Sequence, residues 1–263
     1  MQTLNNMKKL FLFAVLISLS QLLVAQKRII FHYRNNINVS GRTSYIKLEQ
    51  YYLNGRSLEL SIPNEQLKLE GDTTYNGIRR ITSVKIVLND NDKRIPFVLK
   101  SPDISGLIYA ERIWPKATYL VVDTLNNFNW KISSETKEIN GETCTKAETD
   151  FRGRKYVAWF KKDNLMKIGP WKFGGLPGII FEVNDIDNIY RYSLENIEYV
   201  DQFPVELQMP KAYNDDEMIS HGTFILKWKA NKKDLEKDND VVNYSLTGSS
   251  TIKHTVAPIK ELY

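Results

Sequence analysis

The chain has 263 residues, of which 42% are hydrophobic and 25% charged, and its formal net charge is +5. This balance is typical of a folded globular protein and excludes collagen-like, low-complexity and fully disordered chains. Lys8 and Lys9 lie in a segment that has the layout of a removable leader, and without these two residues the net charge falls from +5 to +3. So small a charge gives no reason to expect binding to nucleic acid or to an anionic membrane.

Residues 1–25 have the organisation of a secretory signal peptide. A basic start is followed by an apolar run, and the small residue Ala25 closes it. An uncleaved anchor is the alternative, but the run is short for a bilayer span of about 20 residues. We therefore expect residues 26–263 to be a single exported domain without a transmembrane span, in the periplasm or associated with the outer membrane.

Cys144 is the single cysteine, so the sequence excludes an internal disulfide. An exported domain of this length must then be stabilised by core packing, which fits the periplasm of a Gram-negative bacterium. Cys144 lies in a segment of alternating polarity and is interpreted as a small buried residue. The alternative is a nucleophile paired with a histidine.

Alternation of polar and apolar residues predicts strands along most of the chain. The first hairpin joins 44–53 to 57–62 through the turn signal Asn54-Gly55, after a first strand at 28–33. Further strands are predicted at 81–88, 97–100, 107–114, 119–122, 126–132, 142–149, 155–160, 178–183 and 189–194. Asn140-Gly141 gives a second turn signal of the same kind.

Helices are expected only near the C-terminus. Residues 214–217 are predicted to cap a short helix, and residues 229–238 are rich in helix formers. The predicted fold class is therefore mainly β: an antiparallel, hairpin-built curved sheet of the half-barrel kind, with a few short helices near the C-terminus. An irregular sandwich is the alternative.

The segment 167–183 is the most unusual part of the sequence. Glycines and prolines crowd among aromatic and aliphatic residues, and a predicted strand begins directly afterwards. Such a composition indicates a rigid, buried corner with a structural role. The motif residues are Gly169, Pro170, Phe173, Gly175, Leu176, Pro177, Gly178, Ile179 and Ile180. Substitution of Gly178 by a β-branched residue is predicted to destabilise the fold through its backbone conformation.

At this segment the sequence resembles the GLPGLI family, exported proteins of Gram-negative bacteria, whose motif stands here as Gly-Leu-Pro-Gly-Ile-Ile at 175–180. Further matches precede it at Gly141, 144–147, 153–154, 156–160, 169–170 and Phe173. Ile179 replaces the family's leucine, a change that conserves volume, and residues 161–167 also depart from the pattern. The resemblance implies a cell-envelope protein working beside outer-membrane import systems, and it implies no established reaction.

Motifs for metal, cofactor and nucleophile chemistry are absent from the sequence. His32, His221 and His254 are far apart along the chain, and neither H-E-x-x-H nor C-x-x-C occurs. Neither G-x-S-x-G nor a phosphate-binding glycine loop occurs. The sequence therefore predicts no metal and no cofactor, although a metal site assembled from distant strands stays open.

Several charged residues are candidates for catalysis or anion binding, each with a structural alternative. Glu182 and Asp185 are the candidate acid and base of a hydrolase, with a strand face and a turn as the alternative reading. Arg152 and Arg154 are either an anion clamp or exposed turn arginines. The lysine-rich stretch 227–237 is interleaved with acidic residues and is interpreted as a solvated face.

Aromatic residues are abundant, with 14 Tyr, 5 Trp and 11 Phe. Trp159, Phe160, Trp171 and Phe173, close to the motif, either line a groove or fill the core, and the core reading is favoured. The sequence thus favours a non-enzymatic binding or accessory protein. Its expected partner is an outer-membrane or periplasmic protein, a peptide or an apolar ligand. An envelope hydrolase is the alternative.

Overall fold

The computed structural model describes residues 28–39, 42–62, 68–69, 72–75, 78–81, 84–85, 94–104, 106–113, 117–124, 128–163, 166–238, 242–245, 248–251 and 261. The predicted leader, His254 and most of the strand predicted at 81–88 lie outside these residues. Among the described parts of the chain, no helix combines the length and the apolar character that a bilayer span needs.

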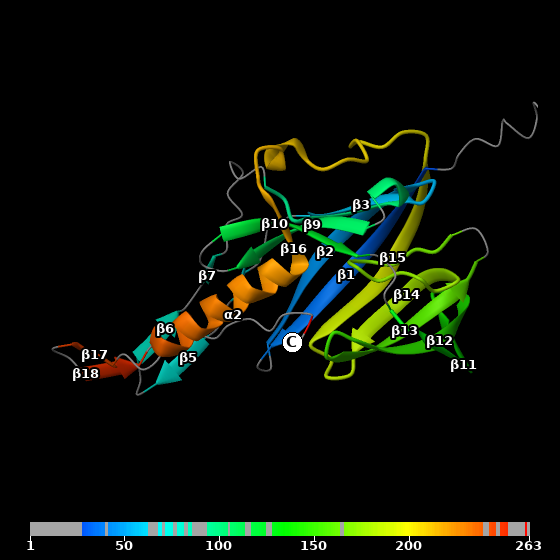
Figure 1. Ribbon diagram of the computed structural model, residues 1–263. Coiled ribbons are helices and arrows are strands. Elements are labelled where there is room, and N and C mark those ends of the chain that lie inside the picture. Colours follow the sequence, from blue (N-terminus) through cyan, green and yellow to red (C-terminus); the bar gives the residue numbers. More distant parts are fainter. Residues whose placement is uncertain are drawn as a thin grey trace, which may run out of the picture.

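Twelve strands form one curved, unclosed sheet (Figure 1). In sheet order they are β11 (Lys131–Ile139), β12 (Glu142–Phe151), β13 (Arg154–Lys162), β14 (Gly178–Asp185), β15 (Tyr190–Val200), β1 (Arg28–Val39), β2 (Arg42–Leu53), β3 (Arg56–Ile62), β8 (Phe97–Ser101), β9 (Gly106–Ile113), β10 (Ala117–Thr124) and β16 (Met218–Ser220). Every neighbouring pair is antiparallel except β10 and β16. The sheet confirms the predicted fold class.

Three small two-stranded sheets and two 3-10 helices complete the described strands and turns. The strand pairs are β4 (Lys68–Leu69) with β7 (Val84–Lys85), β5 (Asp72–Tyr75) with β6 (Ile78–Ile81), and β17 (Val242–Ser245) with β18 (Gly248–Thr251). The 3-10 helices are η1 (Pro102–Ile104) and η2 (Lys211–Tyr213).

The tight hairpins form where the turn signals predict them. Asn54 and Gly55 have φ of 52° and 81°, and Asn140 and Gly141 have φ of 53° and 78°. Positive φ at both central residues defines the turn whose twist matches that of the flanking strands. These turns set the registers of β2 with β3 and of β11 with β12.

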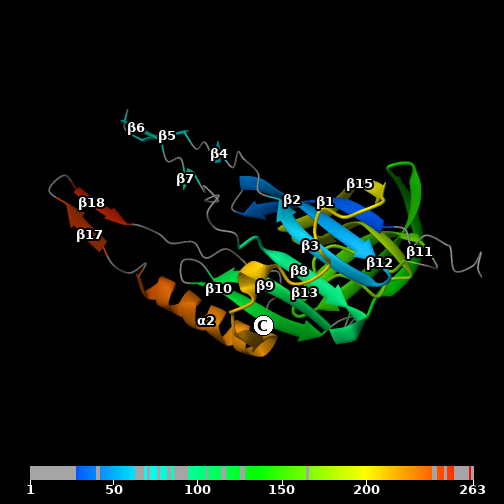
Figure 2. The ribbon, with the colours of Figure 1, turned by 90° about the horizontal axis from the view of Figure 1, so that it is seen from above.

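Each face of the sheet buries apolar side chains. The concave face carries the main core, to which β1 contributes the fully buried Phe31 and Tyr33. On the convex face, Leu58 of β3 and Leu99 of β8 pack beneath the segment 201–217, from which Tyr213 is completely buried. Figure 2 shows this segment passing over β3 and β8. The sheet is therefore covered on both sides at β3 and β8.

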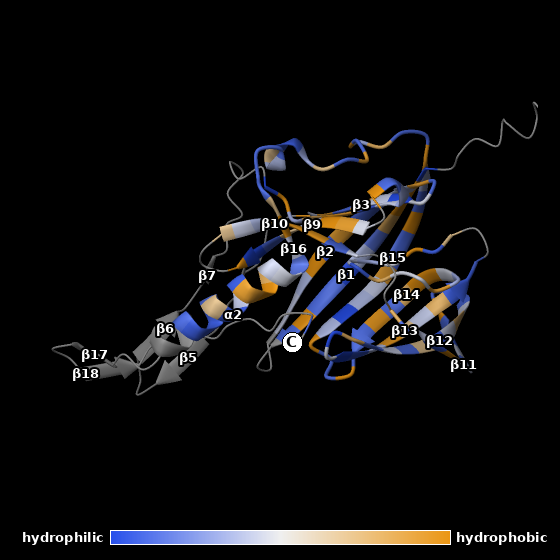
Figure 3. Ribbon diagram, in the orientation of Figure 1, coloured by the Kyte–Doolittle hydropathy of each residue, from blue (hydrophilic) through white to orange (hydrophobic). Residues whose placement is uncertain are grey.

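The one α-helix among the described residues, α2 (His221–Asp238), has 18 residues and follows β16. The Ser220 hydroxyl accepts the backbone N–H of Thr223 at 3.1 Å and so caps the helix. Phe224 and Ile225 are buried against the sheet, and Figure 3 shows the apolar residues of α2 gathered in its first half. The prediction at 229–238 found only the second half of this helix.

The predicted cap at 214–217 is wrong. These residues lie between η2 and β16, so the chain passes through a short strand before the helix begins. The helix starts only where Ser220 leaves that strand and supplies the capping hydroxyl.

Gly178→Val is expected to destabilise the fold by about 3 kcal/mol. A Cβ at Gly178 would collide with the backbone carbonyl of Lys161 on β13. The collision adds to the effect of the backbone conformation, because Gly178 has φ of 159°, which residues with a side chain rarely adopt. Urea unfolding of residues 26–263 measures the change.

Gly222→Ala is the matched control, because a Cβ at Gly222, in the first turn of α2, would make only an ordinary van der Waals contact, 3.9 Å from Ser220 Oγ. This change should leave stability unaltered or raise it by up to about 1 kcal/mol. Equal unfolding midpoints for Gly178→Val and the parent protein would contradict the packing argument.

Candidate functional site

The Gly/Pro segment, residues 168–178, lies against the concave face of the sheet. The Gly169 carbonyl accepts hydrogen bonds from Lys100 Nζ at 2.8 Å and from Gln50 Nε2 at 3.0 Å. Lys100 Nζ also donates to the Phe173 carbonyl at 2.8 Å. Buried side chains of the sheet thus provide the partners that the backbone of an irregular buried segment requires.

Two further hydrogen bonds hold the segment at Trp171 and the strand β14 directly after it at Ile180. The Trp171 N–H donates to Glu59 Oε2 at 2.7 Å, and Tyr33 donates to the Ile180 carbonyl at 2.8 Å. Burial lowers the pKa of Lys100 to about 8 and raises the pKa of Tyr33 well above its ordinary value. The segment is therefore held by polar groups that the fold has removed from water.

Phe173 is the centre of an aromatic core. Its side chain is fully buried, and five rings lie within 6.4 Å of its own, centroid to centroid. The five rings belong to Phe128, Trp130, Tyr156, Trp171 and Tyr192. Trp159 is only partly buried at the margin of this core, with Lys137 Nζ 4.4 Å from its ring centroid. The rings around Phe173 fill the concave core.

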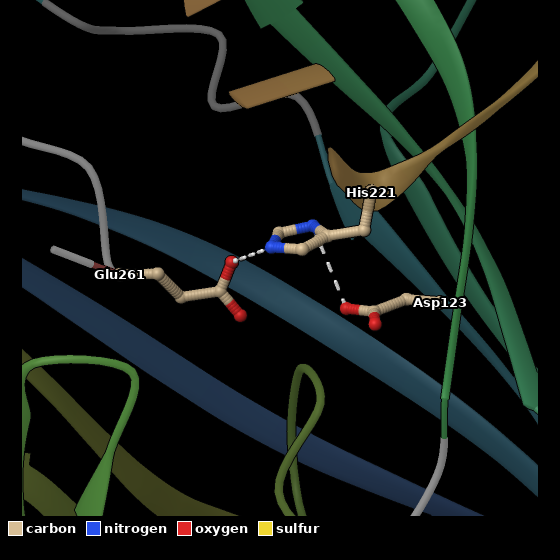
Figure 4. A group of neighbouring side chains, drawn as sticks. All are labelled: Asp123, His221 and Glu261. Atoms are coloured by element: carbon tan, nitrogen blue, oxygen red, sulfur yellow. Dashed lines mark ion pairs between the residues drawn. The ribbon is translucent and has the colours of Figure 1, made fainter. Parts of the chain in front are cut away.

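Beside this core lies a group of charged residues that we call the charged cluster: Asp123, Arg152, Lys172, His221 and Glu261. Asp123 is near the end of β10, Arg152 is in the turn between β12 and β13, Lys172 is in the Gly/Pro segment, and His221 begins α2. Figure 4 shows His221 between the carboxylates of Asp123 and Glu261. Five separate parts of the chain therefore meet at this point.

Asp123 is the anionic partner of both cations in the charged cluster. Its two carboxylate oxygens each accept a hydrogen bond from Arg152 at 2.6 Å, and Oδ2 lies 2.9 Å from Lys172 Nζ. Burial opposes the ionisation of Asp123, but the hydrogen bonds from Arg152 and the charge of Lys172 outweigh it. The pKa of Asp123 is consequently held well below its usual range.

Glu261 completes the charged cluster from the opposite side. Its Oε1 lies 2.9 Å from both Lys172 Nζ and Arg152 NH1, and its Oε2 lies 3.1 Å from His221 Nε2. Burial, and then the neighbouring charge of Lys172, lower the pKa of His221 to about 4. His221 is therefore neutral at pH 7: Nε2–H faces Glu261, and Nδ1 accepts the Tyr109 hydroxyl at 2.8 Å.

The charged cluster includes a ligand set of the kind that holds metal ions. One ligand atom from each of Asp123, His221 and Glu261 lies within 4.8 Å of the others. However, Lys172 Nζ lies 2.9 Å from an oxygen of each carboxylate, where its ammonium already balances their charge. These residues form an ion-pair cluster and do not fit a metal centre.

Sequence reasoning found only part of the charged cluster. It singled out His221 and Arg152 separately. It missed Asp123, Lys172 and Glu261, because these residues form no motif of fixed spacing in the sequence. One signal was present: Lys172 stands inside an apolar, glycine-rich corner, and a buried lysine is rare unless it is paired.

The two predicted hydrolase carboxylates do not form an acid and base pair. Glu182 pairs with Lys137 at 2.7 Å and with Arg191 at 2.9 Å. Asp185 is buried, pairs with Arg154 at 3.1 Å and accepts the backbone N–H of Tyr190. Residues three apart in a strand point to opposite faces of the sheet.

The remaining candidates also have structural partners. Arg152 and Arg154 both bind carboxylates, and neither is an exposed turn residue. Cys144 is fully buried, and burial raises its thiol pKa to about 11, which is the reverse of nucleophile activation. His32 lies on the outer face, 3.2 Å from Glu198.

The lysine-rich stretch of α2 is a solvated face over the part whose side chains are described. All four of its lysines there are exposed, and they are Lys227, Lys229, Lys232 and Lys233. This arrangement agrees with the interpretation of the sequence.

No family model and no curated protein matches the chain. Among solved structures, PNGF-II is 12% identical with a TM-score of 0.48, over 78% of this chain and 32% of that one. This chain therefore spans about a third of the length of PNGF-II.

Two other solved structures resemble the chain more weakly. A domain from Vibrio parahaemolyticus, described as an outer membrane lipoprotein-sorting protein, is 9% identical with a TM-score of 0.26, over 70% of this chain and 88% of that one. A DUF1329 family protein from Desulfovibrio piger is 10% identical with a TM-score of 0.22, over 71% of this chain and 91% of that one. Likenesses at this level carry no argument about activity, so the resemblance to the GLPGLI family stays a prediction.

Lys100→Met is expected to destabilise the protein by about 3 kcal/mol, because it leaves two buried carbonyls, those of Gly169 and Phe173, without this donor. Lys137→Met removes a partly exposed lysine paired with Glu182 and should cost less than about 1 kcal/mol. Chemical unfolding measures both variants. Similar losses in the two would contradict the anchoring role of Lys100.

Acidification is expected to destabilise the protein through His221. The folded-state pKa of about 4 lies below the ordinary value of 6.5, so the unfolded chain takes up the proton first as the pH falls. The stabilising contribution is complete above pH 6.5 and is lost as the pH falls toward 4.

Melting temperatures between pH 7 and pH 4.5 test this expectation. His221→Asn should show a smaller decrease on acidification than the parent protein, and the control His32→Asn should retain the parent's decrease. Identical slopes for the parent and His221→Asn would show that His221 does not cause the pH dependence.

Proposed function

We propose that this chain is a non-enzymatic binding or accessory protein of the Gram-negative cell envelope that recognises a protein or peptide through its outer surface or through the margins of its sheet. One observation carries the proposal. The concave side, where a half-barrel would hold an apolar ligand, contains the Gly/Pro segment and the aromatic core around Phe173. Recognition is therefore assigned to the outside of the sheet and to its margins.

The sequence supports the cellular part of this proposal. The leader-like residues 1–25 favour export, and for an exported chain the single cysteine favours the periplasm. The resemblance at 175–180 favours an envelope protein that works beside an outer-membrane import system. The separation of Glu182 from Asp185 onto opposite faces weighs against the hydrolase alternative that rests on these two residues.

Two measurements on residues 26–263 test the proposal. Cross-linking in envelope preparations, followed by mass spectrometry, should recover a recurrent envelope protein. Native mass spectrometry of the purified protein should give the mass of the polypeptide alone. The destabilised Gly178→Val variant is the control, since a specific cross-link requires the folded surface.

Other outcomes would redirect the assignment. A stoichiometric lipid in the native mass spectrum would establish an apolar carrier in place of a partner-binding protein. If no envelope protein is cross-linked repeatedly and the purified protein hydrolyses an envelope substrate, the protein is an envelope hydrolase.

A further inference from the structure

We propose that Arg152, Lys172 and His221 form a carboxylate-binding site which Glu261 occupies as an internal ligand and which an acidic peptide segment of a partner enters by displacing Glu261. This inference rests on the proposed function, because it names the chemistry by which a partner would be recognised.

The first argument is the convergence of donors on one carboxylate. Oε1 of Glu261 accepts hydrogen bonds from Lys172 Nζ and Arg152 NH1, each at 2.9 Å. Oε2 accepts a hydrogen bond from Lys172 Nζ at 3.1 Å and lies 3.1 Å from His221 Nε2. These donors come from three elements that are distant in the sequence. Both oxygens of the carboxylate are thereby bound, as in recognition sites for carboxylate ligands.

The second argument is that contacts independent of Glu261 hold the same donors in place. Asp123 holds the Arg152 guanidinium through two hydrogen bonds at 2.6 Å and binds Lys172 at 2.9 Å. Tyr109 donates to His221 Nδ1 at 2.8 Å, and its ring lies 4.2 Å from Lys172 Nζ. The site is therefore organised before the ligand carboxylate arrives, which reduces the entropic cost of binding.

The backbone beside Lys172 also points to a site held in a fixed geometry. Trp171 has φ of 48°, a conformation that is unfavourable for a bulky residue. Its N–H is bound by the buried carboxylate of Glu59. Such strain persists only where the surrounding structure enforces it.

Charge balance indicates the chemical class of the ligand. Arg152 and Lys172 carry two positive charges, Asp123 supplies one negative charge, and His221 is neutral at pH 7. Glu261 brings the sum to zero. Without Glu261, the other four residues of the charged cluster carry one excess positive charge, which an incoming anion can balance. A monoanionic carboxylate restores the balance, whereas a phosphate dianion would overcompensate it.

Exposure indicates the side from which a ligand enters. The side chains of Asp123 and Lys172 are 4% and 3% exposed and form the floor of the site. Those of Arg152 and His221 are 16% and 11% exposed and lie at its rim. A glutamate or aspartate side chain on a peptide can therefore reach the floor from the rim.

Peptide binding to a Glu261→Ala variant tests the proposal. The probe is a fluorescent peptide with the sequence of residues 257–263, Ala-Pro-Ile-Lys-Glu-Leu-Tyr, blocked at both ends so that its glutamate is the only carboxylate. Anisotropy titrations compare residues 26–263 with and without the substitution. Internal Glu261 competes at an effective concentration in the millimolar range, so Glu261→Ala should bind the probe at least about tenfold more tightly than the parent protein.

Matched controls isolate the carboxylate and its donors. A probe with glutamine in place of glutamate should not bind. Adding Arg152→Gln to Glu261→Ala should abolish binding, and adding Arg191→Gln, which alters an exposed arginine paired with Glu182, should not. Sodium acetate at equal concentration should fail to displace the probe, which separates a peptide ligand from small carboxylates.

Three results would each overturn the proposal: equal binding by the parent protein and Glu261→Ala, equal binding of the glutamine probe, or displacement by acetate as effective as by unlabelled peptide. Circular dichroism confirms folding. If Glu261→Ala unfolds, Glu261→Gln, which keeps the side-chain shape, replaces it with the same expected results. The assay needs no envelope partner, so a negative titration beside a recurrent cross-link removes this site and leaves the proposed function intact.

Discussion

The carboxylate of Asp123, shared between Arg152 and Lys172, joins the two ends of an open sheet. Asp123 lies on β10, the strand next to one edge, and Arg152 lies in the turn between the second and third strands from the other edge. The two ends of an unclosed sheet share no backbone hydrogen bonds, so only side-chain contacts can connect them. Removing one partner would leave a buried charge unpaired at a cost of about 3–5 kcal/mol. This contact links β10 to the turn between β12 and β13 and to the Gly/Pro segment.

The fold class could be predicted because its causes are local. Period-two alternation and the Asn54-Gly55 and Asn140-Gly141 turns specify hairpins, and neighbouring hairpins build the sheet. The start of α2 could not be placed in the same way. Its cap, Ser220, is also the last residue of β16, and the strand exists only because β10 pairs with it in parallel. Tertiary pairing, which leaves no local signal, decided that boundary.

The charged cluster could not be predicted from local sequence patterns either, because its residues meet only in the folded sheet. Arg152 and Glu261 are 109 residues apart and meet only after the sheet has curved. Glu182 and Asp185 are near neighbours in sequence, but the strand directs them to opposite faces. The informative residue was Lys172, a lysine within an apolar corner. Its position implies paired carboxylates, but the sequence does not say which ones.

The placement of β1 at the middle of the sheet bears on how the chain folds. β1 pairs with β2 on one side and with β15 on the other, where Arg28 lies opposite Val200. During synthesis, one side of the first strand must therefore wait until about residue 200 has emerged. Pairings of such sequence separation slow folding, because the entropic cost of closing the loop precedes the gain from contacts. Throughout that interval one edge of β1 has no partner strand. Until β15 pairs with it, this edge can pair with a wrong strand of the same chain or of another chain.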